Sequence, residues 1–213
     1  MNWLPNKQTL LRLLPDSLAL TRGPTHARCA YLTFDDGPNP QFTPPLLDLL
    51  ARYGAHGSFF LIGDQIERYP AIVERIVAEG HLIGNHSYSH PQFDRLPLAG
   101  QLAEIERTDR LLERFDGRAR HRFRTPRGVA PARLLLHLAK ARRGITYWSY
   151  DSLDYDDHPV PMLCEALQRH GLRNGEIVLM HDDSARAQGI LEQMLPRWRD
   201  QGIALHALPE EPG

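Results

Sequence analysis

The sequence predicts an α/β protein built as a closed or nearly closed (β/α) barrel of about seven parallel strands. Short apolar runs alternate with segments of helical periodicity along the whole 213-residue chain. This alternation is typical of parallel strands joined by crossover helices. About seven such repeats occur without a break in composition, which favours a barrel; the alternative is an open, doubly wound sheet.

The first part of the chain is expected to form two strands and two helices. Cys29–Phe34 is an almost unbroken apolar run that ends at acidic residues, as in a buried parallel strand. Thr43–Tyr53 follows as a helix, because Pro44 suits a helical first turn. Ser58–Ile62 is a second apolar strand. In Pro70–Glu79 the apolar side chains recur with the 3.6-residue period of an amphipathic helix.

The middle of the chain continues the alternation. His81–Gly84 is a short strand, and Leu98–Phe115 is a long helix with its charges on one side. Arg122–Arg124 is a strand stub in front of a proline. Pro131–Ala141 is predicted as a helix and Ile145–Tyr150 as a strand.

Two more helix–strand units complete the chain. Pro161–His170 is predicted as a helix and Glu176–Met180 as an apolar strand. Ala185–Arg199 is the last expected helix and Ile203–Leu205 the last strand. No internal repeat or low-complexity linker interrupts the series, which indicates one domain over residues 28–213.

Residues 1–27 are predicted as an N-terminal extension of that domain. Within it, Lys7–Leu20 is expected to form a short amphipathic helix that packs on the domain; weak contact with a membrane surface is the alternative. No apolar run approaches the roughly 18 residues of a transmembrane helix. Arg12 interrupts the apolar stretch that a signal peptide would need. We therefore expect a cytoplasmic protein.

Composition narrows the partners. The formal net charge is −1, which gives no indication of a nucleic-acid partner. The two cysteines, Cys29 and Cys164, lack the spacing of metal ligands and are interpreted as small buried residues.

Polar groups suited to chemistry follow five of the predicted strands. In parallel α/β folds the active site lies at the carboxyl ends of the strands, so these groups are expected to meet at one rim. The groups are Asp35 with Asp36, His86 with His90, Arg124, Asp151 with Asp154, and His181.

Two histidines and an acidic strand end suggest a metal centre. His86 and His90 are four residues apart, which on a helical turn would place both rings on one side. Alone, such a pair is as well explained by two solvated histidines. Two histidines with one carboxylate leave positions open for water and substrate, as in catalytic sites. Asp35 and Asp36 point in different directions if they extend a strand, so only one of them is expected to bind the metal.

These segments resemble a known family. Thr33–Pro38 reads Thr-Phe-Asp-Asp-Gly-Pro and His86–His90 reads His-Ser-Tyr-Ser-His. Together they resemble the polysaccharide deacetylases with the NodB homology domain, carbohydrate esterase family 4. The resemblance extends from about Tyr31 to Leu205. It implies a distorted (β/α) barrel, in agreement with the strand count.

The resemblance also implies roles for the first two motifs. Asp35 would be the general base. Asp36, His86 and His90 would hold a divalent metal, most often zinc, with cobalt or nickel as alternatives.

The third motif of the family is matched with one departure. Arg124 would orient Asp35 through a charge-assisted pair and lower its pKa. Arg127 stands where the family usually has an aromatic residue, and its backbone N–H would stabilise the oxyanion. Its side chain is expected either to grip a phosphate or carboxylate of the substrate or to point into water or pair with an acid.

The last two motifs supply the acid. Asp151–Tyr155 resembles the fourth motif, with Tyr155 in place of tryptophan as an aromatic wall. Leu179 introduces the fifth motif and would contact the substrate. His181 would protonate the leaving amine, with Asp154 holding its ring and raising its pKa.

The implied activity is metal-dependent hydrolysis of N-acetyl groups on the amino sugars of a saccharide, in surface polysaccharide biosynthesis. The expected substrate is soluble and linked to a lipid or a nucleotide. Two alternatives remain open. One is an O-acetyl esterase or another C–N hydrolase on the same fold, and the other is a non-catalytic carbohydrate-binding descendant.

Overall fold

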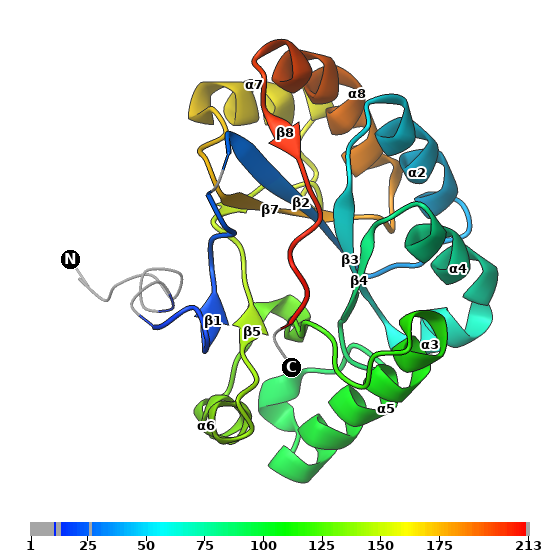
Figure 1. The fold of residues 1–213 in the computed structure, drawn as a ribbon, viewed down its shortest axis with the longest axis vertical. Coiled ribbons are helices and arrows are strands. Elements are labelled where there is room, and N and C mark those ends of the chain that lie inside the picture. Colours follow the sequence, from blue (N-terminus) through cyan, green and yellow to red (C-terminus); the bar gives the residue numbers. More distant parts are fainter. Residues whose placement is uncertain (1–10, 12–13, 26, 212–213) are drawn as a thin grey trace.

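The structure is a computed structural model that describes residue 11 and residues 14–25 and 27–211. Its strands lie at the centre and its helices surround them (Figure 1). The strands are β1 (Ala19–Leu20), β2 (Cys29–Asp35), β3 (Gly57–Leu61), β4 (Leu82–Asn85), β5 (Ile145–Thr146), β6 (Tyr150–Asp151), β7 (Glu176–His181) and β8 (Ala204–Leu205). The α-helices are α2 (Thr43–Arg52), α3 (Gly63–Arg68), α4 (Pro70–Ala78), α5 (Leu98–Asp116), α6 (Ala132–Lys140), α7 (Val160–His170) and α8 (Ala185–Asp200). Two short 3₁₀ helices cover Phe93–Arg95 and Pro126–Gly128.

The strand order confirms the predicted barrel. The main sheet runs β4-β3-β2-β7-β6, and β8 pairs in parallel with the start of β2. Phe123 forms isolated parallel bridges to Asn85 of β4 and to Ile145 of β5, and β5 pairs in parallel with β1. The strands therefore form a distorted ring rather than the open sheet that was the alternative.

One segment closes the ring, and here the prediction of a single strand over Ile145–Tyr150 is wrong. The segment forms β5 at one side of the gap and β6, beside β7, at the other. Between them the stacked rings of Tyr147 and Trp148 have centroids 3.9 Å apart. Because neighbouring side chains of a strand point to opposite faces, these rings cannot stack within a regular strand.

Other local predictions need correction. The predicted strand Arg122–Arg124 is reduced to one bridge residue, Phe123, although the Arg122 carbonyl and the Arg124 N–H both hydrogen-bond to the backbone of Asn85 in β4. Helix α3 was missed because six residues are too few to show a helical period. The predicted helix Lys7–Leu20 lies partly outside the described residues. Over residues 14–20 it is wrong, since the Pro15 carbonyl closes a turn and β1 follows.

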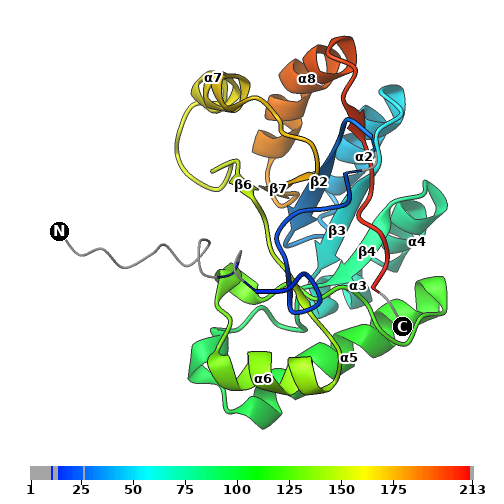
Figure 2. The same ribbon diagram turned by 60° about the vertical axis from the view of Figure 1, so that its left-hand side comes forward.

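Alternation along the strands decides which side chains face the barrel interior. In β2, Ala30, Leu32 and Phe34 pack in the outer core beneath the helices. Cys29 and Tyr31 pack in the inner core with Phe60 and Phe123. The two-residue period then sends Thr33 and Asp35 inward as well. Helices α5 and α6 cover one side of the barrel next to each other (Figure 2).

Among the residues that the structure describes, no helix combines the length and apolar character needed to cross a membrane.

Candidate active site

The carboxyl ends of β2 and β7 bring two candidate catalytic residues together. Asp35 and His181 are register partners on these neighbouring parallel strands. In β7, Ile177 and Leu179 belong to the inner core, so the same period directs His181 into the barrel mouth. The placement at strand ends that the sequence predicted is therefore found.

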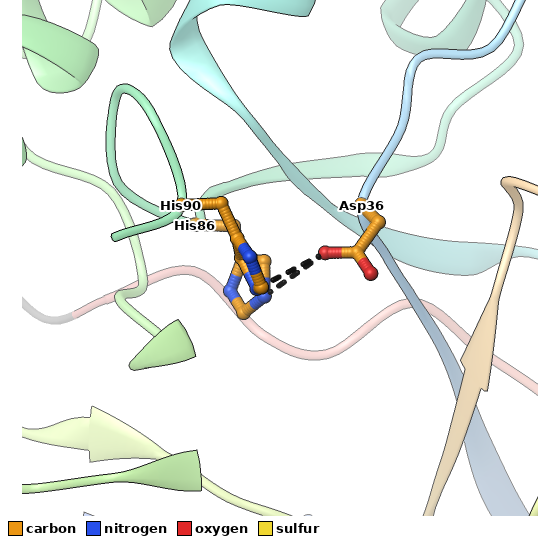
Figure 3. Close-up of side chains that lie close together, drawn as sticks. All are labelled: Asp36, His86 and His90. Carbon is orange, nitrogen blue, oxygen red and sulfur yellow. Dashed lines mark ion pairs between the residues drawn. The ribbon is translucent and has the colours of Figure 1, made fainter. Parts of the chain in front are cut away.

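Asp36 leaves the strand in a left-handed backbone conformation, with φ 77°. This turns its carboxylate toward two imidazoles (Figure 3). Asp36 Oδ1 lies 3.4 Å from His86 Nε2 and 3.4 Å from His90 Nε2. The strand alternation expected for the two carboxylates ends at Asp36, and both reach the barrel mouth, since Asp35 Oδ2 also lies 3.7 Å from His86 Nε2. Of the two, Asp36 is the one that contacts both imidazoles.

The two histidines converge, but not on a helical turn as the spacing suggested. Residues 86–90 form a loop in which Ser87 and His90 have φ values of 68° and 51°. Fully buried Asn85 supports it, because its side-chain oxygen accepts a hydrogen bond from the Ser87 N–H at 2.9 Å. Glu104 of α5 accepts another from the Ser89 N–H at 2.7 Å. The left-handed residues, rather than a helix, turn both rings the same way.

The donor set fits a divalent cation. One ligand atom from each of Asp36, His86 and His90 lies within 4.8 Å of the others. Asp36 Oδ1 is buried, and among the described residues no donor reaches hydrogen-bond geometry with it. The Arg124 carbonyl accepts a hydrogen bond from His86 Nδ1 at 2.9 Å. A carbonyl only accepts, so Nδ1 carries a proton and Nε2, which faces Asp36, is the atom that could bind a metal.

The protonation states of Asp36 and His90 also suit a bound cation. Burial acts to raise the pKa of Asp36, but contact with His86 and the charges of His86 and His90 outweigh it and lower the pKa to about 2. Burial and the charge of His86 lower the pKa of His90, and the charge of Arg127 acts in the same direction. Burial acts to lower the pKa of His86, but the charge of Asp35 and the contact with Asp36 outweigh it and raise the pKa, so a cation would replace a proton on this ring. An ionised carboxylate and a neutral imidazole are the forms that bind metal.

Arg124 holds Asp35 from beneath. Its guanidinium is fully buried and donates to Asp35 Oδ1 at 2.7 Å and to Thr33 Oγ1 at 2.9 Å. The same group lies 4.1 Å from the centre of the Phe60 ring. Asp35 Oδ2 remains 3.7 Å from His86 Nε2, at the edge of the candidate metal site.

Asp154 holds His181 through two contacts. It accepts from His181 Nδ1 at 2.9 Å and from the His181 backbone N–H at 2.8 Å. Burial acts to lower the pKa of His181, but the hydrogen bond and charge of Asp154, with the charges of Asp35 and Asp36, raise it to about 9. Since Nδ1 is engaged, Nε2 is the atom that can deliver a proton.

A cavity of about 290 Å³ lies above these groups. Asp35, Asp36, His86, His90 and His181 line it together with Arg127, Gly128, Trp148, Asp151, Tyr155 and Leu179. All ten residues assigned roles from the sequence therefore lie in this wall or, for Arg124 and Asp154, hydrogen-bond directly to it.

Three lining residues supply the rim. Arg127 is exposed and left-handed, with φ 52°, and among the described residues no acid forms an ion pair with it. Arg127 lines the cavity, and the alternative that it pairs with an acid is not found. Its exposure agrees both with a contact to the substrate and with the alternative that it points into water. Tyr155 is 55% exposed, meets the His181 ring edge-on at 5.3 Å between centroids and donates to Asp151 at 3.2 Å.

Sequence reasoning missed Trp148 and Gly128. Trp148 lines the cavity and is buried against Tyr147. A Cβ at Gly128 would lie 2.7 Å from Trp148 and 2.8 Å from the Tyr147 hydroxyl, so only glycine fits under the pair. Two adjacent aromatic residues just before the fourth motif were the available signal.

The mouth of the barrel holds a carboxylate, an imidazole and three further side chains that could bind a metal ion. This combination is typical of the active sites of metal-dependent hydrolases. Residues 22–148 match the family model described as "Polysaccharide deacetylase". The chain belongs to the polysaccharide deacetylase family, which confirms both the resemblance and the predicted enzyme class.

Relatives and solved structures agree with this assignment. A chitooligosaccharide deacetylase of Sinorhizobium fredii is 33% identical over 205 residues, covering 89% of this chain and 94% of that protein. A peptidoglycan-N-acetylglucosamine deacetylase of Bacillus cereus is 32% identical over 194 residues, covering 88% of this chain and 69% of that protein. A crystal structure of a peptidoglycan N-acetylglucosamine deacetylase in complex with an N-oxidanyl-benzamide has a TM-score of 0.81 at 30% identity and covers 90% of each chain. The individual residue roles stay predictions.

Proposed function

We propose that this chain is a metal-dependent deacetylase that removes N-acetyl groups from the amino sugars of a saccharide. One observation carries the proposal. A carboxylate held by an arginine, Asp35, and an imidazole held by a carboxylate, His181, line the same cavity as the donor set of Asp36, His86 and His90. A binding module has no use for a matched base and acid.

Asp36, His86 and His90 would hold the ion, and zinc suits two imidazoles and one carboxylate. When bound, a divalent ion would polarise the acetyl carbonyl and lower the pKa of water. The N-oxidanyl-benzamide in the related crystal structure is a hydroxamate, a type of group that chelates metals, which agrees with a metal-dependent activity.

Residues of the chain supply the proton transfers and the stabilisation of the oxyanion. Asp35, oriented by Arg124, takes a proton from the attacking water through its free oxygen Oδ2. The backbone N–H of Arg127 donates to the oxyanion that develops on the acetyl group. His181 delivers a proton from Nε2 to the sugar nitrogen, which leaves as a free amine.

His181 favours an amide over an ester as the substrate. An amine leaves poorly unless it is protonated, so amide cleavage needs an acid that stays charged at neutral pH. The raised pKa of His181 meets that need. An alkoxide leaves more readily, which makes an O-acetyl ester the second candidate.

Cavity size and charge bear on the substrate. About 290 Å³ is small for a ligand cavity, since such sites span about 300–1,000 Å³. It suits one sugar unit, with the rest of the saccharide over the rim beside Tyr155. Arg127, which has no acidic partner among the described residues, suits a carboxylate or phosphate there. We therefore propose a lipid- or nucleotide-linked saccharide of surface polysaccharide assembly, modified in the cytoplasm.

Acetate release from N-acetylglucosamine oligomers and from nucleotide-linked N-acetylhexosamines tests the activity, with the protein loaded with zinc or cobalt. We expect release that stops after chelation and returns with metal. The matched O-acetyl sugars are assayed in parallel, and faster cleavage of these would favour the esterase. Saccharide binding that Asp35→Asn leaves unchanged, with no release from any substrate by metal-loaded wild type, would overturn the proposal in favour of a binding protein.

A further inference from the structure

Asp182, directly after His181 at the end of β7, is buried beneath the turn that carries Asp36. It is 1% exposed, although nothing in the proposed chemistry uses it. Its backbone N–H donates to the carbonyl of Asp35 at 3.2 Å, and this joins the ends of β7 and β2. The side chain lies beneath the turn that follows Asp36, against Gly37.

The carboxylate of Asp182 lies against Gly37. A Cβ built on Gly37 would be 2.3 Å from Asp182 Oδ2 and 2.4 Å from Oδ1. The backbone of Gly37 is outside the left-handed region, so its conformation alone would accept alanine. Asp182 is what requires a glycine next to Asp36.

A hydrogen-bond relay ties the far end of the same turn. Asp182 Oδ2 accepts from the Thr43 hydroxyl at 2.5 Å, and Thr43 Oγ1 accepts from the Asn39 backbone N–H at 2.8 Å. The Asn39 side chain in turn accepts from the Gln41 N–H at 2.9 Å. The chain from Asp35 to Asn39 is thus held at both ends by one buried residue.

This arrangement is unfavourable for stability alone. Asp182 Oδ1 is buried, and no group in the described part of the chain donates a hydrogen bond to it. Burying an acid whose hydrogen bonds are only partly satisfied costs free energy. Local conflicts of this kind are expected where a structure serves function.

We propose that Asp182 is a positioning residue that locks the Asp36–Asn39 turn against the end of β7, and so fixes the Asp36 carboxylate relative to His86, His90 and His181. The inference rests on the proposed metal site. Residues that orient metal ligands from outside the ligand set typically change metal affinity 10–100-fold when they are removed.

Zinc affinity tests this without relying on turnover. Zinc dissociation constants are measured by competition with a chromophoric chelator, together with the melting temperature of the metal-free protein. We expect zinc to bind about 10–100-fold more weakly to Asp182→Ala and about as well to Asp182→Asn as to wild type, because Asn keeps the shape and an acceptor. Asp200→Ala, which removes an exposed acid at the C-terminal end of α8, is the control and should bind zinc like wild type.

Thr43 supplies a second test if Asp182→Ala fails to fold. Thr43→Val has the same shape but lacks the hydroxyl of the relay, whereas Thr43→Ser keeps it. We expect weaker zinc binding for Thr43→Val and recovery for Thr43→Ser. Equal zinc affinity in these two variants would overturn the relay.

Gly37→Ala tests the contact itself. In the wild-type background, Gly37→Ala should weaken zinc binding by more than about tenfold. In the Asp182→Ala background it should weaken zinc binding little further, because the side chain with which the new Cβ would clash is absent. Additive losses would overturn the proposal, as would wild-type zinc affinity in folded Asp182→Ala. If wild type bound no divalent metal at all, the proposed function would fail instead, so the two failures are distinguishable.

Discussion

The substitution Asp154→Asn tests whether Asp154 keeps His181 protonated, as the proposed role of His181 as the acid requires. The substitution removes the charge beside His181 and one of the two acceptors that Asp154 offers, while an amide oxygen can still meet Nδ1. The pKa of His181 is raised from 6.5 to about 9, with Asp154 the leading contributor after burial, which opposes the shift. That difference of about 2.5 units corresponds to about 3 kcal/mol favouring the charged ring.

The sign of the effect follows from the role of His181. With His181 as the proposed acid, activity requires the protonated ring and is expected to fall as pH rises through the pKa of His181. At about pH 8, a group with a pKa of about 9 is roughly nine-tenths protonated, whereas one at its ordinary value of about 6.5 is only about 3% protonated. Asp35 and Asp36 still support the charge in the variant, and a bound cation would weaken their support. We therefore expect the alkaline limb to move down by at least about one pH unit.

The assay is the pH profile of kcat/KM for acetate release by the metal-loaded protein, which reports the free enzyme. Asp156→Asn, in the same loop and exposed, is the control that removes a charge without touching His181. The reasoning is refuted if the alkaline limb of Asp154→Asn coincides with that of wild type. A loss of rate that is uniform at every pH would also refute it, because it would mean that Asp154 only holds the ring in place.

Three further substitutions separate the other roles. Asp35→Asn should lower kcat by at least about 10²-fold and leave the zinc dissociation constant within about threefold of wild type in chelator competition; loss of zinc would make Asp35 a ligand. Arg124→Met should lower the free energy of unfolding, measured in urea, by about 3–5 kcal/mol, because Asp35 stays buried without its partner. Adding Asp35→Asn to this variant should restore part of the lost free energy. A loss below about 1 kcal/mol would contradict the pairing of Arg124 with Asp35. Arg127→Tyr should reduce the ratio of kcat/KM for anionic over neutral substrates at least about fivefold, and an unchanged ratio would remove the anion contact.

Strand-based features of the fold were predictable because each strand carries its own signal. Residues Cys29–Phe34 of β2 form an almost unbroken apolar run that predicts a buried parallel strand without any tertiary information. The strand ends then placed the polar groups on one rim. The closure of the ring could not be predicted in this way, because β5 and β6 have only two residues each. Which neighbours such short strands select depends on packing, here the stacked pair of Tyr147 and Trp148, and not on their own sequence.

Residue identities in the site were predictable, but their geometry was not. The spacing of His86 and His90 suggested a helical turn, yet the rings converge through two left-handed residues supported by Asn85. Left-handed conformations of Ser and His are uncommon, and no local sequence pattern predicts them. Asp182 could not be predicted either, because in the sequence a buried acid next to a candidate catalytic histidine looks like any exposed acid.

The adjacency of Asp35 and Asp36 explains why this site needs backbone irregularity. Asp35 is the last residue of β2, so the strand period alone points it inward to Arg124. A continued strand would send the next carboxylate outward into the helix layer, away from both histidines. The left-handed conformation of Asp36 prevents this and brings its oxygen 3.4 Å from each imidazole. Such a conformation is costly for a residue with a Cβ. It therefore needs neighbours that hold it, and the contacts of Asp182 with Asp35, Gly37 and Thr43 supply them.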